Sequence, residues 1–75
     1  MSPLHEGPGQ RLWRVRRQFD QMDAILVKTE SDWHLRYILN GEDVMSRAYD
    51  DQSAAIDDAG ERLKELQRVG WYTHW

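Results

Sequence analysis

The stretch Trp33-His34-Leu35-Arg36-Tyr37-Ile38-Leu39-Asn40-Gly41 decides the fold. Large apolar side chains at its odd positions alternate with His34 and Arg36, which is typical of a strand with one buried face. Asn40-Gly41 then supplies two residues that tolerate the positive φ of a tight hairpin turn. We therefore expect a strand that turns at Asn40-Gly41 and returns over residues 44–49.

The segment before this hairpin fits two patterns. Its apolar residues lie at helical spacing, as listed here: Leu12, Val15, Phe19, Met22 and Leu26. However, Trp13 and Val15 also alternate with arginines, and Ala24-Ile25-Leu26-Val27 is a run rich in residues that favour strands. We favour two strands, over residues 12–18 and 23–29, joined by a polar turn near Asp20-Gln21.

The last third of the chain predicts one amphipathic helix. Asp50 or Asp51 can cap its first N–H groups. An apolar stripe that can dock on a sheet consists of Ile56, Ala59, Leu63 and Leu66. Gly70 stands where a left-handed residue ends a helix, so we expect Trp71 to pack back on Leu66, as in a Schellman motif.

Together these elements predict an α+β fold, in which a four-stranded antiparallel meander is followed by one helix packed on one face. We expect a flexible leader over residues 1–10 and a single domain over residues 11–75. A chain of 75 residues and 8.9 kDa has a small core, which makes oligomerisation a plausible source of added stability.

Three elements of this order resemble a group of short bacterial proteins for which no activity is established. They are the opening Leu12-Trp13-Arg14-Val15-Arg16, the Asn40-Gly41 hairpin and the helix that closes on Gly70-Trp71. The likeness covers residues 12–71. It implies the meander-plus-helix fold and a bacterial source, and it implies no function.

Composition excludes several classes of protein. The chain has no cysteine, so it contains neither a disulfide nor a thiolate metal site. No apolar run is long enough for a transmembrane helix, and the first residues lack a secretion signal, so we expect a cytoplasmic protein. The three histidines, His5, His34 and His74, lack the spacing of metal ligands, and we expect neither a metal nor a cofactor.

The chain also lacks the marks of an enzyme. Its serines occupy turn, strand and helix-start positions, and no glycine-rich loop precedes the helix. The adjacent carboxylates Asp50-Asp51 and Asp57-Asp58 are explained by a helix start and a solvated helix face. A chain this short has no walls for a deep pocket, so we expect no catalysis and no small-molecule substrate.

One helix covers only one face of such a sheet, which leaves the other face for a partner. We expect this open face to carry Arg14, Arg16, Arg36 and Arg47, and we count Trp75, in an aromatic tail, as a lesser candidate for partner contact. Arginine suits association with an acidic protein surface or with a second copy. The alternative is weak nucleic-acid binding through the same arginines, against which the net charge of −3 argues.

Overall fold

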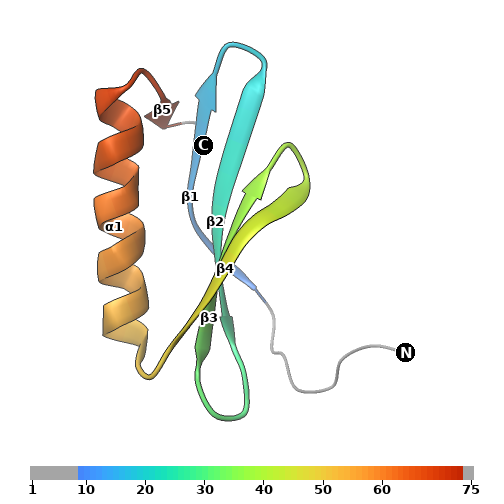
Figure 1. Ribbon diagram of the computed structural model, residues 1–75, viewed down its shortest axis with the longest axis vertical. Coiled ribbons are helices and arrows are strands. Elements are labelled where there is room, and N and C mark those ends of the chain that lie inside the picture. Colours follow the sequence, from blue (N-terminus) through green and yellow to red (C-terminus); the bar gives the residue numbers. More distant parts are fainter. Residues whose placement is uncertain (1–8, 74–75) are drawn as a thin grey trace.

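The computed structural model describes residues 9–73 and confirms the predicted α+β meander with its C-terminal helix (Figure 1). In chain order the elements are β1 (Gln10–Arg17), β2 (Asp20–Lys28), β3 (Trp33–Leu39), β4 (Glu42–Tyr49), α1 (Gln52–Arg68) and β5 (Tyr72–Thr73). All strand pairs are antiparallel, and the strand order is β4-β3-β2-β1-β5. The two-residue β5 is an addition to the four strands expected.

Two of the three hairpin turns illustrate one correct and one wrong prediction. Asn40 and Gly41 have φ values of 52° and 89° and form the predicted turn between β3 and β4. The β1–β2 turn lies at Gln18-Phe19, two residues before the predicted Asp20-Gln21. The reason is that Asp20 and Gln21 are strand residues held across the sheet by Asn40: its Nδ2 donates to Asp20 Oδ1 (3.2 Å), and its Oδ1 accepts from the Gln21 N–H (2.9 Å).

Both ends of α1 have the capping groups that the sequence predicts. The Asp51 carboxylate accepts a hydrogen bond of 2.8 Å from the Ala54 N–H and caps the first turn. At the other end Gly70 has φ 110°, and the Trp71 N–H donates to the Leu66 carbonyl at 3.0 Å. The predicted C-terminal motif is therefore confirmed, with Trp71 buried.

The inner face of α1 keeps Ala59, Leu63 and Leu66 of the expected stripe but not Ile56. Ile56 is 44% exposed, whereas Ala55 is fully buried and takes its place beside Ala59. These two alanines allow the helix to approach the sheet closely, and Leu63 and Leu66 pack against the edge of the core. No helix within residues 9–73 combines the length and apolar character that a membrane crossing requires.

The core lies between α1 and one face of the sheet. It consists of Trp13, Val15, Ala24, Leu35, Tyr37, Ala59 and Trp71. The Trp13 and Tyr37 rings meet with their centroids 5.9 Å apart. The predicted inward orientation of these strand residues is confirmed, and their neighbours in sequence consequently point to the opposite face.

Candidate functional site

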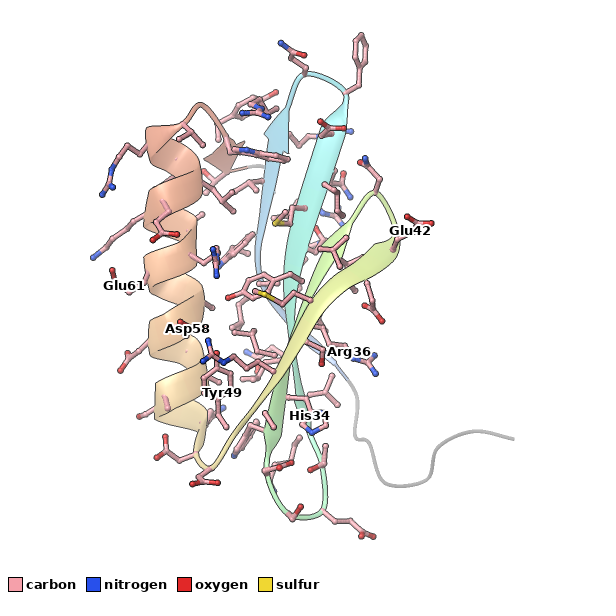
Figure 2. All side chains as sticks on the ribbon, viewed as in Figure 1. His34, Arg36, Glu42, Tyr49, Asp58 and Glu61 are labelled. Atoms are coloured by element: carbon pink, nitrogen blue, oxygen red, sulfur yellow. The ribbon has the colours of Figure 1, made fainter. Side chains whose placement is uncertain are left out.

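The structure does not bring the four predicted arginines together on one face. Arg14, Arg16 and Arg36 alternate with buried residues and lie on the face away from α1, where Figure 2 shows Arg36 projecting. Arg47 pairs in register with the buried Leu35, so it lies on the helix side of the sheet. The expectation that Arg47 joins the open face is wrong, because a bulge in β4 shifts the alternation of that strand. Trp75 lies outside the described residues.

The charge of Arg14 is neutralised within the fold. Its Nε and Nη2 donate to the two carboxylate oxygens of Asp23, directly opposite on β2, at 2.7 and 3.1 Å. This bidentate bond raises the pKa of Arg14 above its ordinary value. The open face therefore carries an internal ion pair where a free basic patch was expected.

The open face is also partly covered. A Cβ placed on Gly9 would lie 2.8 Å from Cγ2 of Ile25 and 3.7 Å from Cγ2 of Val27, so the main chain at Gly9 lies close to these side chains. Val27 is 4% exposed although it points away from α1. The expectation of a bare sheet face is thus wrong at this end of the sheet.

A groove lies instead on the helix side, where α1 and the β3–β4 hairpin diverge. It has a volume of about 260 Å³ and is lined by Met22, Tyr37, Val44, Met45, Arg62 and Leu66. Val44 and Met45 are 53% and 38% exposed, which is high for apolar strand residues. Sequence analysis missed this groove, although the adjacent apolar pair Val44-Met45 broke the alternation of its strand and signalled a bulge.

A buried hydroxyl adjoins the groove. Tyr37 is only 2% exposed, and its hydroxyl has no hydrogen-bond partner within residues 9–73. Burial and the Asp58 carboxylate raise the pKa of Tyr37, while the polar contact with the Arg62 side chain and its positive charge oppose that rise. The Arg62 guanidinium carbon lies 5.7 Å from the centre of the Tyr37 ring. A polar group left without a partner in such a place costs free energy, which an incoming donor or acceptor would recover.

The two ends of β4 differ in how they contact α1. At the C-terminal end the Tyr49 hydroxyl donates to the Asp58 carboxylate, and Figure 2 shows the two side chains meeting. Burial, this hydrogen bond and the Asp58 charge together raise the pKa of Tyr49 to about 12. At the other end the hairpin turns away from α1, as Figure 1 shows, and Val44 and Met45 line the groove there.

The outer edge of β4 has no strand beside it within residues 9–73. β4 is the terminal strand of the sheet, and all its residues except Tyr49 are exposed. The Asn40 N–H donates to the Gln21 carbonyl at 2.8 Å, so by antiparallel alternation the even-numbered residues of β3 bond to β2 and the odd-numbered ones to β4. Asp43 and Ser46 lie opposite even-numbered residues of β3, so their N–H and C=O groups point outward.

No metal site accompanies these features. In the part of the chain that the structure describes, no three histidine, aspartate or glutamate side chains cluster as they would to hold an ion. His34 lies 3.4 Å from the Asp32 carboxylate, which is a local pair next to the β2–β3 turn.

No protein-family model, curated protein or solved structure matches this chain. Function must therefore be inferred from the surface of the fold itself.

Proposed function

We propose that this chain is a cytoplasmic, non-enzymatic protein-association module. Its binding surface is the β4 edge together with the adjoining groove lined by Met22, Val44 and Met45, in place of the open sheet face that the sequence favoured. An extended segment of a partner would add a strand beside β4 through main-chain hydrogen bonds. Its side chains on the helix side would enter the groove.

The observation that carries this proposal is the combination of a free strand edge with an apolar groove beside it. Strand addition draws affinity from the outward N–H and C=O groups of Asp43 and Ser46, and specificity from pockets for alternate side chains. The groove supplies such a pocket, and the unpartnered Tyr37 hydroxyl beside it favours a side chain that carries a polar tip.

Nucleic-acid binding has less support from the same structure. Phosphate contacts require free cationic side chains gathered on one surface. Arg14 is held by Asp23, Arg47 lies on the other face, and the main chain at Gly9 lies close to Ile25 on the open face.

A display selection of extended peptides on the immobilised full chain tests the proposal. The matched control is Ser46→Pro, which removes an outward N–H and leaves the bonds between β3 and β4 in place. We expect selected peptides to bind the wild type and not the variant, and to shift the NMR signals of Val44 and Met45. Peptides that shift only the NMR signals of Arg16 and Arg36 would contradict the proposal. A single-stranded oligonucleotide that shifts the signals of Val44 and Met45 would also contradict it.

A further inference from the structure

We infer that the strand added beside β4 comes from a second copy of this chain, so that two β4 strands pair antiparallel about a two-fold axis and join two sheets into one. This inference rests on the proposed function, because it names the occupant of the same edge. Three independent properties of β4 select one register for the pairing: the direction of its free main-chain groups, the faces of its side chains and its charges.

The free main-chain groups restrict the register first. Only residues whose N–H and C=O point outward can exchange hydrogen bonds with the second copy, and these include Asp43, Ser46 and Ala48. If Asp43 lies opposite Ser46 of the second copy, the two-fold axis also sets Ser46 opposite Asp43 of the second copy. The outward groups of Asp43 and Ser46 are then used on both copies, whereas a register that pairs Ser46 with Ala48 would set the two Arg47 side chains together.

The side-chain faces agree with this register. Asp43 and Ser46 lie opposite Ile38 and Arg36, on the open side of the sheet. The bulge places Val44 and Met45 together on the helix side, where both line the groove. The register sets Val44 against Met45 of the second copy, so four exposed apolar side chains meet at the axis beside two grooves. A shift by one residue would set helix-side residues against open-side ones.

The charges agree as well. The same register sets Glu42 opposite Arg47 of the second copy, and both residues lie on the helix side because they pair with Leu39 and Leu35. The two-fold axis creates this opposite-charge pair twice. Charged side chains on an edge strand ordinarily discourage pairing. Here the charges oppose the register that would set Arg47 opposite Arg47 of the second copy. They favour the register that sets Arg47 opposite Glu42 of the second copy.

Sedimentation of the full chain over a range of concentrations is the first test, and we expect reversible dimers of twice 8.9 kDa. In the dimer the amide hydrogens of Asp43 and Ser46 are expected to exchange more slowly than in the dilute monomer. Glu42→Lys and Arg47→Glu each set like charges together, and each is expected to weaken the dimer about tenfold or more.

The double variant Glu42→Lys/Arg47→Glu restores opposite charges and is expected to recover the dimer. Arg16→Glu is the matched control, since it makes the same charge change on the open face and should leave association unchanged. Far-ultraviolet circular dichroism shows that each variant is folded.

A wild type that stays monomeric at all concentrations would overturn the inference, and so would a dimer that survives Ser46→Pro or is not recovered by the charge swap. None of these outcomes overturns the proposed function, which the peptide selection tests. The proposed function is overturned when no extended peptide binds at β4.

Discussion

The indole N–H of Trp13 donates a hydrogen bond of 2.9 Å to the main-chain carbonyl of Ala59. The bond joins β1 to the middle of α1 across the core, and both residues are almost fully buried. It fixes where along the sheet the helix lies, and hence where the groove between the helix and the β3–β4 hairpin opens.

Trp13→Phe is expected to lower the free energy of unfolding by about 1–3 kcal/mol, because it removes this hydrogen bond and leaves a cavity. Urea denaturation followed by fluorescence or circular dichroism measures the change. Phe19→Ser is the matched control, since Phe19 is 98% exposed at the β1–β2 turn and its loss should change stability by less than about 0.5 kcal/mol. Equal effects of the two substitutions would contradict the assignment of Trp13 to the core.

Tyr49 makes stability depend on alkaline pH. Its pKa in the folded state is raised from 10.0 to about 12, so folding favours the neutral phenol. The contribution is fully present below about pH 10 and is lost as the pH rises toward 12. Tyr49→Phe should therefore make the loss of stability in that range shallower. Urea midpoints measured on both proteins between about pH 9 and pH 11 check this, and parallel curves would contradict it.

Replacement of glycine by alanine is expected to have opposite effects on stability at Gly60 and Gly70. Gly60 lies inside α1, and a Cβ there would meet nothing within 4 Å, so Gly60→Ala is expected to raise stability by about 0.5–1 kcal/mol. Gly70 has φ 110°, so Gly70→Ala is expected to lower stability by about 1–2 kcal/mol. Thermal unfolding of the two variants beside the wild type distinguishes the signs.

We expect Arg14 and Asp23 to be energetically coupled but to have no role in association. In a double-mutant cycle with Arg14→Ala and Asp23→Ala, the double variant should lower the free energy of unfolding by less than the sum of the two single changes. The reason is that either change alone leaves the other charge unpaired. The coupling should weaken as salt is added. Sedimentation of the double variant should match that of the wild type, and loss of the dimer would return the open face to consideration.

The sequence predicted the elements that depend on local patterns. The alternation around Leu35 and Tyr37, the turn at Asn40-Gly41 and the helix end at Gly70 each follow from conformational preferences that lie within a few residues. The β1–β2 turn was misplaced because its position is set by the distant Asn40 side chain, and the exposed Phe19 at its tip has no turn preference that a pattern could detect.

The candidate site was harder to predict because it depends on register and on the position of the helix. A one-residue bulge at Val44 exchanges the faces of β4 and carries Arg47 to the helix side. The neutralisation of Arg14 required the pairing of β1 with β2, and the close approach of Gly9 to Ile25 required the path of the chain before β1. None of these relations is visible in the composition of a single strand.

The two margins of the sheet are unequal, and this limits how far an assembly can grow. β5 occupies the outer side of β1 at Val15 and Arg16, and an irregularity in pairing near Leu12 interrupts the strand further along. β4 is the margin that a neighbour can join, and a two-fold contact consumes it on both molecules at once. The other margin of each molecule is β1, where β5 and the irregularity near Leu12 hinder a further strand, so the architecture favours a closed, finite particle over fibril growth.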